Sequence, residues 1–214
     1  CRWRYHLVEE ERPGQVFPVE EDEHGTYFFN SKDLCLLAHL SEVMESGVDS
    51  LKIEGRMKSV HYVASVVKTY RAAIDAYLRA PARFSVRPAW LEELEKVSHR
   101  AYTAGFFLGA TGAADQIYGT SSYQQTSVFV GVVEGYEPMS GWAAVEQRNH
   151  IEAGEEIEVL SPHGDPFRQT IEEMRDDAVA VIASAPHAQQ KIQIKMKQPV
   201  MVGSILRRPL SKEA

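Results

Sequence analysis

The spacing of apolar residues changes near residue 124, and this change limits the possible folds more than any other feature. Before it, apolar residues recur at the spacing of amphipathic helices. After it, short runs are separated by turn residues, and Lys191–Lys197 alternates apolar with polar side chains, as a half-buried strand does. We therefore expect an α/β segment followed by an all-β segment, the second being a small antiparallel β-barrel.

The α/β segment predicts helix, strand and helix in succession. A first helix is expected from Ser31, its N-cap, to Gly47, its stop. The run "VDSLKIEG" predicts a buried strand, and a second helix begins near Ser59 and ends at Pro81. The residues expected to face the core are Val63, Val67, Tyr70, Ile74 and Tyr77.

This succession is typical of parallel β/α units, of which a closed barrel needs eight. Residues 1–81 are therefore expected to form a partial parallel β/α barrel. Residues 82–123 predict a helical connector with a short helix at Pro88–Arg100, and residues 124–214 the β-barrel. An incomplete barrel exposes apolar surface and open strand edges, so we expect copies of the chain to associate through residues 1–80.

Charge and cysteine content exclude some classes of protein. A formal charge of −7 argues against nucleic-acid binding through a generally basic surface, although it allows a local basic patch. No apolar run is long enough for a membrane span, so no membrane partner is expected. Two cysteines cannot build a disulfide framework, which favours a reducing cytoplasm. The first residue is Cys1 rather than Met, so we expect a piece of a longer protein.

Lys52, Glu54 and Arg56 are the first candidate site. They lie at and just beyond the end of the strand predicted at residues 48–54, the edge where β/α barrels place active sites. A Lys, a Glu and an Arg there are suited to bind a small molecule that carries carboxylates, with Arg56 as a bidentate clamp. The alternative is a structural ion pair between Lys52 and Glu54.

Cys35 and the basic C-terminal residues are the other candidates. Cys35 is expected in the first turn of the helix opened by Ser31, where a thiol is suited to metal ligation or nucleophilic attack. The alternative is a small apolar filler, which its spacing alone favours. A stripe of basic residues is expected either to contact phosphates or only to keep strand ends soluble. It consists of Lys191, Lys195, Lys197, Arg207 and Arg208.

Several longer segments of the sequence resemble those of peptidase family U32, the collagenase-like proteins. They are "CRWRYHLVEEERPGQVFPVEEDEHGTYFFNSKDLC", "GVDSLKIEGRMKSVHYVASVVKTYRAAIDAY", "VSHRAYTAGFFLG" and, in the β region, "VGVVEGY", "VEQRNHIEAGEEIEVLSPHGD" and "GSILRR". The resemblance covers nearly the whole chain. It implies the last strands and helices of a catalytic β/α barrel, followed by a barrel similar to domain 2 of elongation factor Tu.

The resemblance also implies a cofactor. In relatives that hydroxylate tRNA, ribosomal RNA or quinone precursors, four cysteines hold an iron–sulfur cluster, and Cys35 of "NSKDLC" matches the last of them. Cys1 of "CRW" corresponds to a ligand in some branches only. The cluster is therefore expected in the full-length protein and not on this chain alone, which we expect to be inactive by itself.

Three functions follow from the resemblance. The first is hydroxylation of the wobble uridine of tRNA with prephenate as co-substrate, since proteins with this C-terminal barrel resemble those that carry it out. Lys52 and Arg56 fit the two carboxylates of prephenate. The second is a collagenase-like peptidase whose β-barrel binds substrate protein. The third is a non-catalytic binding module.

Overall fold

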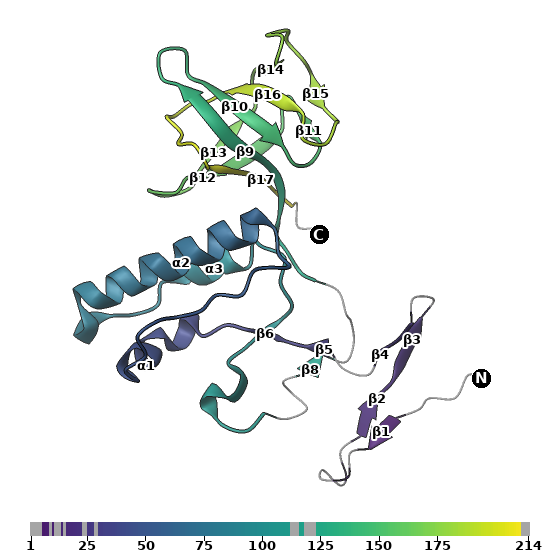
Figure 1. The fold of residues 1–214 in the computed structure, drawn as a ribbon, viewed down its shortest axis with the longest axis vertical. Helices are drawn as coiled ribbons and strands as arrows, with labels where there is room; N and C mark the ends of the chain where they lie inside the picture. Colours follow the sequence, from purple (N-terminus) through teal and green to yellow (C-terminus); the bar gives the residue numbers. More distant parts are fainter. Residues whose placement is uncertain are drawn as a thin grey trace. The chain divides into compact units, whose positions relative to one another are not determined.

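The computed structural model describes residues 6–8, 10, 14, 16–22, 25–27, 30–111, 116–117 and 123–210. The chain forms two compact units, each built from two stretches of sequence (Figure 1). The first unit combines Cys1–Asp49 with Ser98–Gln124, and the second combines Ser50–Val97 with Gln125–Ala214. The three-part division at residues 81 and 123 stays a prediction. Among the described residues, no helix is both long and apolar enough to cross a membrane.

The first unit contains short strand pairs and little helix. Its parallel pair is β6 (Asp33–Leu34) with β7 (Tyr102–Thr103). Its helical turns are η1 (Leu37–His39), α1 (Leu40–Glu45) and η3 (Gly105–Leu108). The antiparallel pairs are β1 (His6–Val8) with β2 (Val16–Pro18), β3 (Glu20–Asp22) with β4 (Gly25–Tyr27), and β5 (Asn30–Ser31) with β8 (Gln116–Ile117).

The first predicted helix is shorter than expected. Ser31 is not its N-cap, because Ser31 lies in β5 and the following residues continue in strand pairing. The backbone N–H of Cys35 donates to the Thr103 carbonyl at 2.9 Å, which extends the β6–β7 pairing and delays the helix to Leu37. Gly47 is confirmed as the stop, since it follows α1 with a φ of 82°.

The helices of the second unit begin where the sequence predicts. The side chain of Ser59 caps α2 (Val60–Arg79) by accepting a hydrogen bond from the Tyr62 N–H at 3.2 Å, and Pro81 follows the helix end. A 3₁₀ turn, η2 (Pro81–Arg83), leads to α3 (Pro88–Leu94), which starts on Pro88 and is shorter than the predicted Pro88–Arg100.

The buried face of α2 is not the one predicted. Val63 and Val67 are 39% and 46% exposed, and Tyr70, Ile74 and Tyr77 are only half-buried. The buried side chains of α2 are His61, Ser65, Val66, Thr69 and Ala73. The prediction failed because hydrophobicity assigns polar residues to solvent, whereas here His61 and Ser65 contact the buried Arg207 of the sheet.

A curled antiparallel sheet of seven strands makes up the rest of the second unit, in the order β13-β12-β17-β9-β10-β16-β14. Figure 1 shows α2 and α3 side by side, on the side of this sheet where β12 and β17 lie. Ile192, Ile194 and Met196 are buried, which confirms the alternation predicted in Lys191–Lys197. The strands are β9 (Ser127–Glu137), β10 (Trp142–Gln147), β12 (Glu156–Leu160), β13 (Phe167–Thr170), β14 (Met174–Asp176), β16 (Lys191–Lys195) and β17 (Ile205–Pro209), with β11 (Ile151–Glu152) and β15 (Ser184–Ala185) as a separate pair.

Candidate functional site

Lys52, Glu54 and Arg56 lie on an extended segment that leads into α2. All three side chains are exposed, while Leu51 and Ile53, the residues before Lys52 and Glu54, are half-buried. The Arg56 backbone N–H donates to Oε1 of Glu54 at 3.0 Å. Among the described residues no ion pair joins Lys52 to Glu54. The three charged side chains are therefore available to a ligand, and their binding role stays a prediction.

The predicted strand at residues 48–54 is wrong. A strand needs a backbone partner along one edge, and no strand of the described part pairs with this segment. The segment instead packs on α2. A Cβ added to Gly55 would lie 2.9 Å from Cγ2 of Val63, so only glycine allows this approach.

Cys35 lies between β6 and η1, not in the first turn of a helix as predicted. It is half-buried and directly follows the carboxyl end of the one parallel strand pair in the described ranges. An ion pair fixes the strand before it. Nε and Nη2 of Arg100 lie 2.9 Å and 2.8 Å from the same oxygen of Asp33, Oδ1, and the backbone N–H of Arg100 donates to Oδ2. Cys1 lies outside the described residues.

The candidate residues belong to different units of the chain. Cys35 belongs to the first unit, and Lys52, Glu54 and Arg56 belong to the second. Within the part of the chain that the structure describes, no group of three or more His, Cys, Asp or Glu side chains is placed to hold a metal ion.

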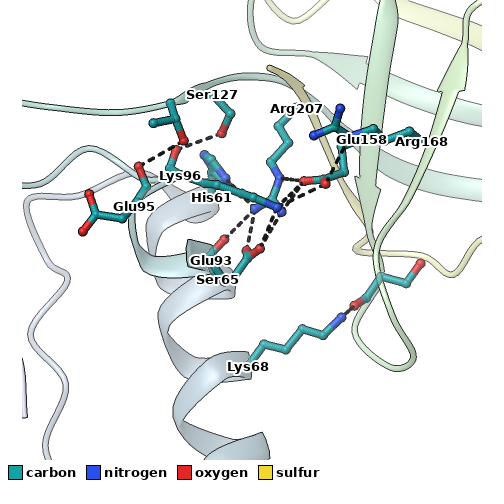
Figure 2. Close-up of polar contacts among 12 residues, drawn as sticks. His61, Ser65, Lys68, Glu93, Glu95, Lys96, Ser127, Glu158, Arg168 and Arg207 are labelled. Atoms are coloured by element: carbon teal, nitrogen blue, oxygen red, sulfur yellow. Dashed lines mark hydrogen bonds and ion pairs between the residues drawn. The ribbon is translucent and has the colours of Figure 1, made fainter. Parts of the chain in front are cut away.

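A buried charge cluster that the sequence did not predict joins the helices of the second unit to its sheet (Figure 2). We call it the Arg207 cluster. Its centre, Arg207 of β17, is fully buried. The surrounding residues come from α2, from α3 and the turn after it, and from β12: His61, Ser65, Glu93, Lys96 and Glu158.

Arg207 uses each of its nitrogens in this cluster. Nη1 and Nη2 donate to Oε1 and Oε2 of Glu93 at 2.5 and 2.7 Å, which is a bidentate pair. Nε donates to Oε2 of Glu158 at 2.6 Å, and Nη2 forms an ion pair with the same oxygen. Nη1 also lies 3.2 Å from the Ser65 hydroxyl and 3.4 Å from Nε2 of His61. One guanidinium thus connects β17 to β12, α2 and α3.

The cluster has a definite protonation state. Burial favours neutral His61, and the charge of Arg207 acts in the same direction, so the pKa of His61 falls to about 4. Burial by itself raises the pKa of Glu93 and Glu158, but their bonds to Arg207 and Lys96 outweigh it and the net pKa of both is lowered. His61 is therefore neutral and both carboxylates are charged at neutral pH.

The cluster holds structure together rather than supplying a reactive group. Both buried carboxylates are bound by Arg207, and Lys96 donates to Glu158 at 3.0 Å. Farther along α2, Nζ of Lys68 donates to the carbonyls of Ser161 and Gly164, both at 2.7 Å (Figure 2). These contacts fix α2, and with it the segment that carries Lys52–Arg56.

The basic residues of the predicted stripe do not form one exposed, unpaired row, and their contact with phosphates stays a prediction. Arg207 is buried, and three of the other four residues are neutralised by carboxylates. Lys191 pairs with Glu134 and Glu146, Lys197 with Glu172, and Arg208 with Glu155. Spacing along the sequence did not show this, because the carboxylates come from other strands and from loops.

Two family descriptions match the chain, one over its α/β segment and one over its curled antiparallel sheet. Residues 1–117 match the family description "Peptidase family U32", and residues 125–207 match "Peptidase family U32 C-terminal domain". The chain belongs to peptidase family U32, which confirms the family resemblance.

Curated relatives of the chain have two kinds of name. The tRNA hydroxylation protein P1 of Bacillus subtilis is 36% identical over 97% of this chain and 49% of the relative. The tRNA hydroxylation protein P of Escherichia coli is 38% identical over 85% of this chain and 39% of the relative. A collagenase of Porphyromonas gingivalis is 29% identical over 94% of this chain and 47% of the relative. The chain thus spans about half or less of the length of these relatives.

A solved structure was also found. It is the C-terminal domain of a Geobacillus thermoleovorans protein assigned to the U32 peptidases, which is 36% identical over 38% of this chain and 99% of that domain, with a TM-score of 0.37.

Proposed function

We propose that this chain is part of a U32 protein that hydroxylates tRNA at the wobble uridine in the cytoplasm. The observation that carries the proposal is the identity of 36% to the Bacillus subtilis tRNA hydroxylation protein P1, which extends over 97% of the chain and so includes both units. In this proposal the first unit, with its parallel strand pair, completes a β/α barrel, and the curled sheet is the antiparallel barrel that follows it.

Cys35 is the chain's proposed contribution to an iron–sulfur cluster. Its position after a parallel strand supports this role, because the carboxyl ends of such strands carry the active sites of β/α barrels. The described residues supply this single thiol, which does not fit a cluster of four thiolates, so the remaining ligands must come from elsewhere in the full-length protein.

Lys52 and Arg56 are the proposed contacts to prephenate. Both are exposed, and neither takes part in an ion pair among the described residues, which leaves their charges for the two carboxylates of that molecule. Glu54 orients the segment, because its carboxylate accepts the Arg56 N–H.

The test uses the full-length protein in a bacterial strain that lacks its own tRNA hydroxylation proteins. Wild type should restore hydroxylated wobble uridine, measured by mass spectrometry of tRNA digests. Cys35→Ser should lower both hydroxylation and the iron and sulfide content after anaerobic reconstitution. Lys52→Met combined with Arg56→Met should lower hydroxylation with iron and sulfide unchanged. The ligand assignment fails if Cys35→Ser holds as much iron and sulfide as wild type.

A peptidase is the second candidate, because the collagenase of Porphyromonas gingivalis is similar over 94% of the chain. Under this proposal the purified full-length protein should cleave gelatin, and Glu54→Gln or Lys52→Met should reduce cleavage. Absence of cleavage together with restored tRNA hydroxylation would reject the peptidase function.

A further inference from the structure

The outward face of β10, β16 and β14 carries an aromatic side chain between two cations. In the antiparallel register Trp142 of β10 lies opposite Lys195 of β16, and Arg175 of β14 lies opposite Gln193 of β16. The three strands are neighbours in the sheet (Figure 1). The guanidinium of Arg175 lies 4.0 Å from the centre of the Trp142 ring, and Nζ of Lys195 lies 5.6 Å from it.

Arg175 and Lys195 differ from the other Lys and Arg side chains of residues 125–210 in having no carboxylate partner among the described residues. That stretch has eight Lys and Arg side chains. Six of them form ion pairs with carboxylates: Arg148, Arg168, Lys191, Lys197, Arg207 and Arg208. For the other two, Arg175 and Lys195, no carboxylate partner occurs among the described residues, and both lie on the same indole ring. The unneutralised positive charge of this part of the chain is therefore concentrated at Trp142.

Among the described residues, the two carboxylates that the sequence and the strand register place beside this group form no ion pair with Arg175 or Lys195. Glu137 lies opposite Trp142 across the β9–β10 ladder, but its carboxylate accepts the Met139 N–H of the hairpin at 3.0 Å. Asp176, the residue after Arg175, accepts the Ala180 N–H at 2.8 Å. Both carboxylates are thus held by turns of the backbone.

The strand surface beside the Trp142 ring carries a small side chain and is exposed to solvent. Ala144 follows Trp142 on the same face of β10 and is exposed, so no large side chain stands between the ring and solvent on that side. Lys195 is exposed, and its Nζ donates to the Ser140 carbonyl at 2.5 Å, which holds the ammonium group beside the hairpin. Trp142 and Arg175 are half-buried, which limits their movement.

We propose that Trp142, Arg175 and Lys195 form a binding site for single-stranded RNA. Bases stack on aromatic rings and on guanidinium planes, and the Arg175 guanidinium over the Trp142 ring joins both kinds of surface at one place. The positive charges of Arg175 and Lys195 attract the phosphates between the bases. The inference rests on the proposed function, since it names a surface through which the second unit holds its RNA substrate.

The test compares the RNA affinity of matched variants of the 214-residue chain by fluorescence anisotropy. The probes are a labelled single-stranded oligouridylate and, for comparison, a DNA duplex of the same length. Arg175→Ala with Lys195→Ala should weaken binding of the oligouridylate about 10-fold or more and lower the slope of log K against log salt by about 1 to 2. Trp142→Ala should weaken it by about 5-fold or more, and Trp142→Phe by less, because a phenyl ring still stacks.

The control is Lys191→Ala with Lys197→Ala, which removes the same charge from β16 and its end at residues that carboxylates already neutralise. It should change affinity less than about 2-fold. Circular dichroism and thermal unfolding check that each variant is folded. Wild type that does not bind the oligouridylate at low salt, duplex DNA bound as tightly as RNA, or equal losses in the two double variants would each overturn the inference.

The two proposals fail in different ways. If the full-length wild type restores tRNA hydroxylation while Arg175→Ala with Lys195→Ala binds RNA as wild type does, this site is wrong and the proposed function stands. If wild type does not restore hydroxylation, the proposed function is wrong, and the affinities still decide whether the site binds RNA.

Discussion

Arg207 shows how far the environment of one residue can depart from its local sequence. Its neighbour Arg208 is partly exposed and pairs with Glu155, whereas Arg207 is fully buried between two carboxylates. The difference follows from strand geometry, since successive side chains of β17 point to opposite faces. Placing a guanidinium in the interior requires that every charge around it be paired.

Replacing Arg207 by Met should be strongly destabilising, because it leaves Glu93 and Glu158 buried without their counter-charge. We expect a loss of about 3 to 5 kcal/mol in the free energy of unfolding, measured by urea denaturation. Arg71→Met is the matched control, since Arg71 is 55% exposed, pairs with the exposed Asp75 and should cost less than about 1 kcal/mol. Adding Glu93→Gln and Glu158→Gln to Arg207→Met should recover part of the loss. A cost below about 1 kcal/mol for Arg207→Met would contradict this account.

His61 should make the second unit less stable in acid. Its pKa is about 4 in the folded protein against an ordinary value of 6.5, so between these values the unfolded chain binds a proton that the folded chain does not. Stability should therefore fall as the pH decreases from about 6.5 to 4, by up to about 3 kcal/mol. Glu93 and Glu158, whose pKa is lowered, add a loss in the same direction at more acidic pH.

Urea denaturation at several pH values measures this dependence. His61→Gln should flatten the decline above pH 4.5, whereas the exposed His163, changed to Gln, should leave it unaltered. An unchanged decline in His61→Gln would assign the acid sensitivity to other groups.

At the scale of elements, the ends of α2 could be predicted from the sequence, but its buried face could not. Its start at Ser59 and its end before Pro81 follow from capping and from proline geometry, which are local. Its buried face does not, because His61 and Ser65 become interior residues only when β17 brings Arg207 against them. The strand expected at residues 48–54 failed for a related reason, since a partner strand is a non-local requirement. The alternation in Lys191–Lys197 was predicted correctly because a strand's two faces are visible in the sequence.

For the candidate sites, too, single residues could be found from the sequence, but their grouping in space could not. The sequence singled out Lys52 and Arg56 by their place at the end of a predicted strand, and Cys35 by its place in a predicted helix turn. The family resemblance then assigned these residues to a carboxylate site and to a cluster ligand. The grouping of unneutralised charge at Trp142 was not predictable, because it depends on which cations find carboxylates across the sheet.

Gly55 should be necessary for the packing of residues 50–59 on α2. In Gly55→Ala the new Cβ meets Cγ2 of Val63 at 2.9 Å, so we expect a loss of about 1 to 2 kcal/mol in the free energy of unfolding. Combining Gly55→Ala with Val63→Ala should cost less than the sum of the two single changes, because the clash is removed. Gly135→Ala is the control, since its Cβ would meet Ala144 at an ordinary 3.6 Å. Strict additivity in the double-mutant cycle would contradict the contact.

At the scale of the whole molecule, we expect copies of the chain to associate through residues 1–80. The apolar residues that α2 leaves exposed lie in this range: Val60, Val63 and Val67 are 55%, 39% and 46% exposed. Sedimentation velocity over increasing concentration should show association, and Val63→Lys with Val67→Lys should reduce it. A species that stays monomeric at high concentration would count against the prediction.

The Arg207 cluster also has a consequence for synthesis on the ribosome. Its hydrogen bonds join residues 114 and 142 positions apart in the chain, from Glu93 and Ser65 to Arg207. The helices α2 and α3 are made long before β17. Until β17 is made, Glu93 of the nascent helix α3 lacks this counter-charge, and the second unit reaches its final stability only when β17 pairs with β9 and β12.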